Sequence, residues 1–205
     1  MSIATEVETL VLGLGQNGIS MTPDEFDAVT EYDDLYRYEL IHGVLIVNPI
    51  PSAEERGPNE TLGRFLLNYQ EDNPKGMALD GTLTEEYVCS LDSRRRADRV
   101  IWAGLGRQPD PSTDIPTIAV EFVSAGRRSW KRDYLEKRDE YLSLGVAEYW
   151  VIDRFQRTLT VYRKTAAGIE QQQFREQELY QSKLLPGFDV PLAKILAVAD
   201  RWGKQ

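Results

Sequence analysis

The sequence predicts an α/β protein in which helices flank a mixed central β-sheet. Amphipathic segments and short apolar runs follow one another in the order helix, hairpin, helix, strands, helix, strands, which is typical of a sheet with helices packed on it. The 205 residues suffice for one domain with a substantial core. No repeat or linker splits the chain, so we expect a flexible N-terminal arm at residues 1–20 and a single domain at residues 21–205.

The first elements of the predicted domain are a helix and a β-hairpin. The segment Thr22-Pro23-Asp24-Glu25 is typical of a helix start, because threonine can cap the first turn, proline suits that turn, and the glutamate completes a capping box. Residues 37–41 and 44–47 have the composition of strands, and His42-Gly43 between them predicts a tight turn.

The remaining elements follow from hydrophobic periodicity and turn residues. Residues 59–71 place apolar side chains at helical spacing, and Ile118 to Val123 is the clearest buried strand. Gly145 is suited to end a helix at residues 130–144. We expect further strands at 86–91, 99–102, 149–152 and 158–162, and a short helix at 192–202.

One glycine-rich segment matches a nucleotide-binding pattern by spacing alone. Residues 13–18 fit GxGxxG, but that pattern binds pyrophosphate only where it joins a strand to a helix. The next helix has its own start at Thr22, and a hairpin follows it. We therefore interpret the segment as a glycine turn.

Composition limits the compartment and the kind of metal. Cys89 is the only cysteine and His42 the only histidine, which excludes an internal disulfide and a structural zinc site. A secretory signal begins with basic residues, but no Lys or Arg precedes Arg37. No apolar run approaches the roughly 18–20 residues of a membrane span. We expect a cytoplasmic protein with no membrane partner, and any metal to be a hard cation held by carboxylates.

The net charge of −9 argues at first against a nucleic-acid partner. However, residues 1–34 hold eight acids and no base, which leaves 25 acids against 24 bases in the rest of the chain. Basic residues cluster at 94–99 and 127–138. These clusters are compatible either with a solvated face or with contacts to phosphate.

Two acids suggest a cation site. Glu121 lies inside a predicted buried strand, and Asp98 directly precedes another. A buried carboxylate is costly unless it is paired, hydrogen-bonded or bound to a metal, and each acid alone has a structural explanation. If neighbouring strands present both at one place, the pair forms a site for a hard cation such as Mg²⁺, which activates water and polarises a phosphoryl oxygen.

Several segments resemble the Uma-type family of the restriction-endonuclease-like PD-(D/E)XK superfamily. They are YELIHGVLIV (38–47), RRRADRVIWAG (94–104), TIAVEFVS (117–124) and GRRSWKRDYLEKRDEYLSLGVAEYWVID (126–153). The resemblance spans roughly residues 22–165. It implies a restriction-endonuclease-like core, a phosphodiesterase site that uses Mg²⁺ or Mn²⁺, and DNA as substrate.

The resemblance assigns roles residue by residue. Asp98 matches the aspartate of the PD element and Glu121 the acid of the (D/E)XK element, both as metal ligands. The family pattern has a lysine two positions after this acid, but this chain has Val123 there. The resemblance instead suggests Lys137, in the following helix, as the catalytic lysine. Glu39 matches a hairpin acid near the metal, with a water-facing strand residue as the alternative. For both Lys137 and Glu39, the alternative is an ordinary solvent-exposed residue without a catalytic role.

The leading hypothesis is therefore Mg²⁺-dependent cleavage of DNA. The arginines expected to contact phosphate through charge-assisted hydrogen bonds are Arg96, Arg127, Arg128 and Arg132. A homodimer would suit the cutting of two strands. Val123 and the low basicity leave open a catalytically degenerate module that binds nucleic acid or protein. A sugar hydrolase with a carboxylate pair is a weaker alternative, because nothing in the sequence suggests aromatic side chains arranged to stack on a sugar around either acid.

Overall fold

A computed structural model describes residues 10–203, with the side chains of Arg128 and Ser129 outside the description. Contacts divide the described chain into two compact units, residues 10–50 with 89–95, and residues 51–88 with 96–203. The predicted single domain at residues 21–205 remains a prediction. Of the predicted arm, residues 1–9 lie outside the description, and residues 10–20 contain a short strand and a helical turn.

The first unit contains the predicted helix and hairpin. Thr22 caps the helix, because its Oγ1 accepts the Glu25 N–H at 3.2 Å while Glu25 Oε2 accepts the Thr22 N–H at 2.7 Å. In the turn, His42 and Gly43 have φ values of 48° and 73°, as a tight hairpin requires. The elements of this unit are β1 (Val11–Leu12), η1 (Leu14–Gln16), α1 (Pro23–Asp27), β2 (Glu31–Tyr32), β3 (Tyr36–Ile41) and β4 (Val44–Pro49).

The second unit contains a mixed sheet with strand order β10-β9-β8-β7-β6, and β5 pairs with β6. β7 and β8 run parallel, while the other neighbours of this order run antiparallel. The strands are β5 (Leu79–Cys89), β6 (Arg94–Ala103), β7 (Ile118–Phe122), β8 (Glu148–Asp153), β9 (Thr158–Thr165) and β10 (Gly168–Arg175). β6 begins in the first unit and continues into the second. The predicted mixed sheet is therefore confirmed.

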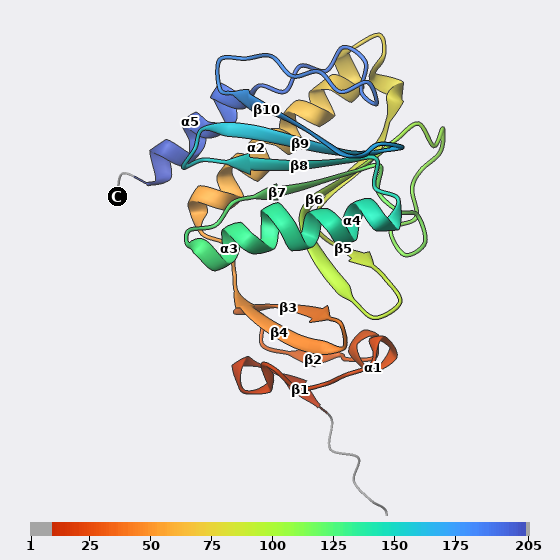
Figure 1. The fold of residues 1–205 in the computed structure, drawn as a ribbon, viewed down its shortest axis with the longest axis vertical. Coiled ribbons are helices and arrows are strands. Elements are labelled where there is room, and N and C mark those ends of the chain that lie inside the picture. Colours follow the sequence, from red (N-terminus) through yellow and green to blue (C-terminus); the bar gives the residue numbers. More distant parts are fainter. Residues whose placement is uncertain (1–9, 204–205) are drawn as a thin grey trace, which may run out of the picture. The chain divides into compact units, whose positions relative to one another are not determined.

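Helices cover both faces of this sheet (Figure 1). One core cluster joins α2 and α5 to the sheet and includes Leu66 of α2, Ile195 of α5, and Val120 and Trp150 of the sheet. The other cluster lies on the opposite face, on the side of α3 and α4, and its helical members belong to η3 and α4. The helical elements are α2 (Ala53–Asp72), η2 (Gly76–Ala78), α3 (Arg127–Lys131), the π-helical turn η3 (Arg132–Glu136), α4 (Lys137–Leu144) and α5 (Leu192–Trp202).

The strand with the most complete burial is β7, whose five residues are all buried. A strand covered by helices on both faces has an apolar side chain at nearly every position, which explains the sequence Ile-Ala-Val-Glu-Phe. Glu121 is the exception in this run and sits in the middle of the sheet. Among the helices at residues 10–203, none combines the length and the apolar composition that a bilayer crossing requires.

Candidate active site

Asp98 and Glu121 lie on the neighbouring strands β6 and β7. The antiparallel register ends with the pair Arg99 and Val120, and Asp98 and Glu121 are the next residues of the two strands. Directly opposed residues of an antiparallel pair point to the same face of the sheet. Ala119, two residues before Glu121, belongs to the cluster under α3 and α4. Both acids are thus assigned to the face that these helices cover.

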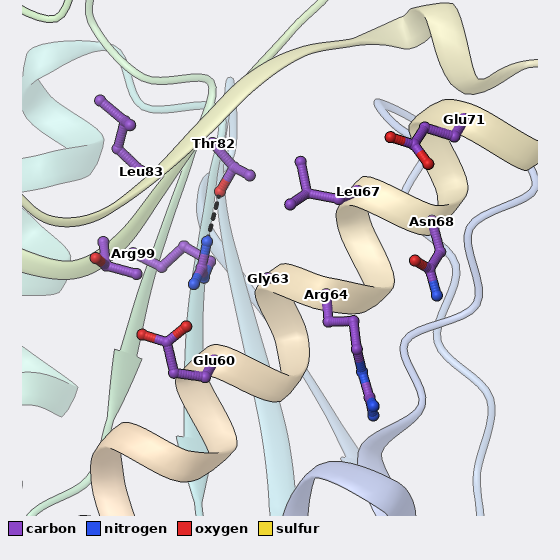
Figure 2. A pocket seen from close by; sticks show the side chains of 10 residues that line it. Glu60, Gly63, Arg64, Leu67, Asn68, Glu71, Thr82, Leu83 and Arg99 are labelled. Atoms are coloured by element: carbon purple, nitrogen blue, oxygen red, sulfur yellow. Dashed lines mark hydrogen bonds between the residues drawn. The ribbon is translucent and has the colours of Figure 1, made fainter.

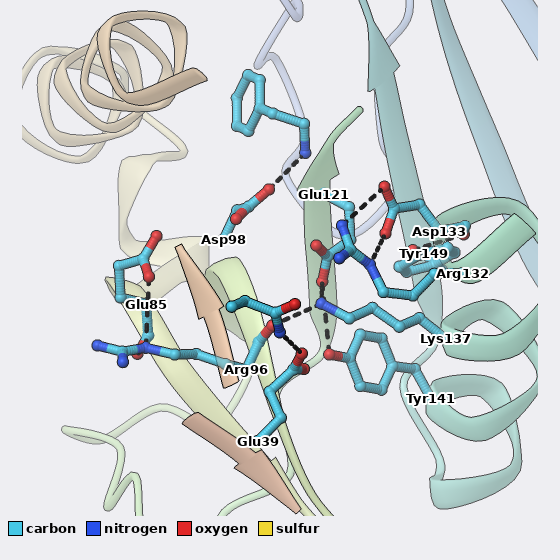
Figure 3. A network of polar contacts seen from close by, with 12 residues as sticks. Glu39, Glu85, Arg96, Asp98, Glu121, Arg132, Asp133, Lys137, Tyr141 and Tyr149 are labelled. Atoms are coloured by element: carbon cyan, nitrogen blue, oxygen red, sulfur yellow. Dashed lines mark hydrogen bonds and ion pairs between the residues drawn. The ribbon is translucent and has the colours of Figure 1, made fainter. Parts of the chain in front are cut away.

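The carboxylate of Asp98 is held by the backbone of the neighbouring strand. Its Oδ2 accepts the N–H of Phe122 at 2.7 Å. On the other side of β6, the backbone carbonyl of Asp98 accepts Nδ2 of Asn59, from α2, at 2.7 Å. Figure 3 shows the carboxylate directed toward the end of β7 that follows Glu121. Asp98 therefore has a fixed orientation beside Glu121.

The carboxylate of Glu121 is buried at 2% exposure and is held from the helical side. Its Oε1 accepts Nζ of Lys137 at 2.9 Å and the hydroxyl of Tyr141 at 3.4 Å. Burial raises the pKa of Glu121 well above its ordinary value, and the nearby charges of Asp98 and Asp133 raise it further. The ammonium of Lys137 opposes this shift of the Glu121 pKa. A second cation at this place would relieve the same repulsion.

Lys137 reaches this site from the first residue of α4, as the displaced-lysine hypothesis requires. Its Nζ also donates to the carbonyl of Arg96 at 2.7 Å. The wide turn of η3, in which the Lys137 N–H bonds to the carbonyl of Arg132, precedes it. π-Helical turns of this kind occur frequently at functional sites. Val123, at the usual lysine position, is buried in the cluster under the same helices.

Asp133 is a site residue that sequence reasoning missed. Its side chain is fully buried, and its Oδ1 accepts Nε of Arg132 at 2.8 Å. Its backbone carbonyl accepts the hydroxyl of Tyr149 at 2.8 Å, and burial raises the pKa of its carboxyl. The signal was present, because Asp133, Lys137 and Tyr141 are spaced four residues apart, the spacing of side chains that share one helix face.

Glu39 belongs to the first unit. Its carboxylate is buried, and its Oε2 accepts Nδ2 of Asn48 on the paired strand β4 at 3.2 Å. The alternative that Glu39 is a water-facing strand residue is therefore wrong. Its role as a third metal ligand beside Asp98 and Glu121 remains a prediction.

The predicted DNA-contacting arginines differ in their surroundings. Arg96 donates to the carbonyl of Glu85 at 2.9 Å, and its Nε lies 3.3 Å from the carboxylate of that residue. Arg132 is paired with Asp133. Arg127 is exposed at the start of α3, and the side chain of Arg128 lies outside the described part of the chain. Two of the four arginines thus already bind acids of this chain.

The donor set suits a hard divalent cation that keeps part of its water shell. Among residues 10–203, no group of three or more His, Cys, Asp or Glu side chains is arranged to hold a metal. Asp98 and Glu121 offer carboxylate oxygens from adjacent strands, and burial together with the charge of Asp98 raises the pKa of Glu121. Mg²⁺ is commonly bound through one or two carboxylates with waters and substrate phosphates completing its shell. The two acids therefore fit Mg²⁺ as a partly hydrated ion.

A solved structure shares the fold. The structure of a putative nuclease from Anabaena variabilis matches with a TM-score of 0.69 and 15% sequence identity, covering 87% of this chain and 99% of the other. At this level of identity the likeness shows the fold alone. Among curated proteins, none matches the chain significantly.

A family model gives the assignment. The model of the Uma2 family, described as putative restriction endonucleases, matches residues 23–198. The matched region includes the strands of Asp98 and Glu121 and the helix of Lys137. It spans most of the described residues, and the resemblance noted from the sequence is confirmed. The chain belongs to the Uma2 family of putative restriction endonucleases.

Proposed function

We propose that this protein is an endonuclease that hydrolyses phosphodiester bonds in DNA with the help of Mg²⁺ or Mn²⁺. Family membership supports a nuclease in general terms. The observation that supports the catalytic proposal most directly is the bond between Lys137 Nζ and Glu121 Oε1, at 2.9 Å and buried on the same face as Asp98. Carboxylates that bind a metal and a nearby ammonium are groups that metal-assisted phosphodiester hydrolysis uses.

In this proposal the chain holds and orients the reacting groups. Asp98 and Glu121 would bind the ion. When bound, Mg²⁺ supplies a more acidic water and polarises a phosphoryl oxygen. Lys137 holds a positive charge where negative charge develops on the scissile phosphate, and the Tyr141 hydroxyl keeps the Glu121 carboxylate in place.

DNA contacts would be largely electrostatic. Arg127 is exposed and available to phosphate, whereas Arg96 and Arg132 must exchange their acid partners, Glu85 and Asp133, to bind it. Arg128 completes the proposed set. Phosphate contacts of this kind weaken steeply as salt concentration rises. A dimer of this chain would place two such sites on one duplex and would allow both strands to be cut.

Nicking of supercoiled plasmid tests the proposed function. We expect the wild-type protein to nick plasmid with Mg²⁺ or Mn²⁺ and to lose this activity with EDTA. Asp98→Asn removes one ligand charge and should lower the rate at least about 100-fold, because metal assistance contributes several kcal/mol to such reactions. Asp72→Asn, an exposed acid of α2, is the matched control.

Two outcomes would count against this function. Plasmid binding without nicking, indifferent to Mg²⁺, would favour a binding module on the same fold. Nicking by Asp98→Asn at the wild-type rate would show that the activity comes from other residues or from a contaminant.

A further inference from the structure

A second polar site lies on the opposite face of the sheet from the candidate active site. α2 and β5 border a groove of about 540 Å³, with Arg99 among its lining residues. Figure 2 shows Arg99 between Thr82 and the helix turn that contains Gly63. Ligand sites usually have volumes of roughly 300–1,000 Å³, so the groove is large enough for a small molecule.

Among the residues that the structure describes, Arg99 is a buried cation with no ion-pair partner. It is 3% exposed, and within the described part of the chain no carboxylate lies within 4.0 Å of its guanidinium. Burial lowers the pKa of Arg99 to about 10, and Glu60 opposes this shift only at longer range. Buried charges are normally paired. The position of the Arg99 guanidinium is therefore compatible with a counter-ion supplied by a bound ligand.

The hydrogen bonds of Arg99 hold its guanidinium in one place and leave part of it available. Nε and Nη2 donate to Asn59 Oδ1 and to the Asn59 carbonyl at 2.8 Å and 3.0 Å, and Nη1 donates to Thr82 Oγ1 at 3.0 Å. A guanidinium has five N–H donors. One N–H therefore remains on each terminal nitrogen, an arrangement that suits the two oxygens of a carboxylate or phosphate.

A glycine on α2 keeps space for this guanidinium. A Cβ atom at Gly63 would lie 2.5 Å from Arg99 Nη2. Any larger residue would displace the guanidinium from its position against the helix. The helix sequence therefore fits the buried cation closely, although glycine weakens a helix interior by about 1 kcal/mol.

The rim of the groove has mixed charge. Arg64 lines it together with Glu60 and Glu71, and all three side chains are exposed. Two carboxylates would repel a polyanion such as a DNA strand, but they can accept hydrogen bonds from an amino or hydroxyl group. This favours a small ligand with a single anionic group.

We propose that this groove binds the oxyanion of a small ligand, a phosphate or a carboxylate, through the remaining N–H groups of Arg99. This proposal is independent of the nuclease function. The groove is nevertheless linked to the active-site strand, since Asn59 accepts from Arg99 and donates to the carbonyl of Asp98.

Thermal unfolding with added anions tests the groove. Inorganic phosphate and acetate, each at 50 mM and at matched ionic strength against NaCl, should raise the Tm of the wild-type protein, because a ligand that binds only the folded state stabilises it. Arg99→Lys keeps the charge but removes the planar fork, and should lose this increase. Arg175→Lys, an exposed arginine on β10, should keep it.

A measurement on the unmodified protein covers the case in which Arg99→Lys fails to fold. In ¹⁵N spectra of arginine Nε groups, titration with phosphate or acetate should shift a protected signal to saturation, and the anion with the larger shift identifies the ligand class. The proposal is overturned if neither anion shifts that signal. It is also overturned if Arg99→Lys folds and keeps the full increase in Tm, or if only a DNA oligonucleotide stabilises the protein.

Discussion

Glu121→Gln should abolish Mg²⁺-dependent cleavage while the fold is retained. The amide keeps an oxygen that can accept from Lys137 and Tyr141, so the hydrogen bonds of this buried position survive in part. The amide lacks the negative charge with which a carboxylate binds a hard cation. A loss of several kcal/mol of metal assistance corresponds to about 1,000-fold or more in rate.

Single-turnover cleavage of supercoiled plasmid at saturating Mg²⁺ measures this effect. Glu170→Gln makes the same chemical change on the exposed strand β10 and should cleave at the wild-type rate. Circular dichroism and urea unfolding establish whether the variant is folded. Folded Glu121→Gln that cleaves within about tenfold of wild type would exclude the carboxylate as a metal ligand.

Lys137→Met should have the largest effect on stability. Methionine preserves most of the apolar stem of lysine, but the Glu121 carboxylate then remains buried without its ammonium partner. Removal of one member of a buried ion pair typically costs about 3–5 kcal/mol. The free energy of unfolding, measured in urea, should fall by this amount, and cleavage should be lost as well.

A double variant identifies the cause of that destabilisation. Adding Glu121→Gln to Lys137→Met removes the uncompensated charge, and should restore part of the lost stability without restoring cleavage. Lys164→Met, at an exposed position of β9, should change the free energy of unfolding by less than about 0.5 kcal/mol. Equal stabilities of Lys137→Met and Lys164→Met would contradict the assigned pairing.

Elements with strong local signals were predicted well. The capping box at Thr22, the His42-Gly43 turn, the buried run of β7 and the helix at residues 192–202 are all confirmed. In each case neighbouring residues alone set the structure, through a cap, a positive φ or a continuous apolar sequence. The α/β fold class could be predicted because helices and strands alternate along the chain.

Other elements depend on contacts that the local sequence does not show. β10 (Gly168–Arg175) was not predicted, because its residues are mostly exposed and polar, and its pairing with β9 defines it. α2 starts at Ala53, six residues before the predicted start, and continues through Pro58, a residue type that disfavours a helix interior.

The candidate site was predicted in part. The sequence named Glu121 and Lys137, and the family resemblance suggested that a lysine from the helix replaces the one missing at Val123; the structure places its ammonium on Glu121. Burial of Asp133 was not foreseen, although its spacing of four residues from Lys137 places both side chains on one helix face. The pairing of Arg132 with Asp133 was also not predicted.

Anomalous diffraction from crystals soaked in Mn²⁺ tests the central claim most directly. We predict one strong peak about 2.0–2.3 Å from a carboxylate oxygen of Asp98 and from one of Glu121, the range of metal–oxygen distances for such ions. The same soak of Glu121→Gln should leave that position without a peak. A peak bound by neither acid, or by one acid with the other turned away from it, would contradict the shared site.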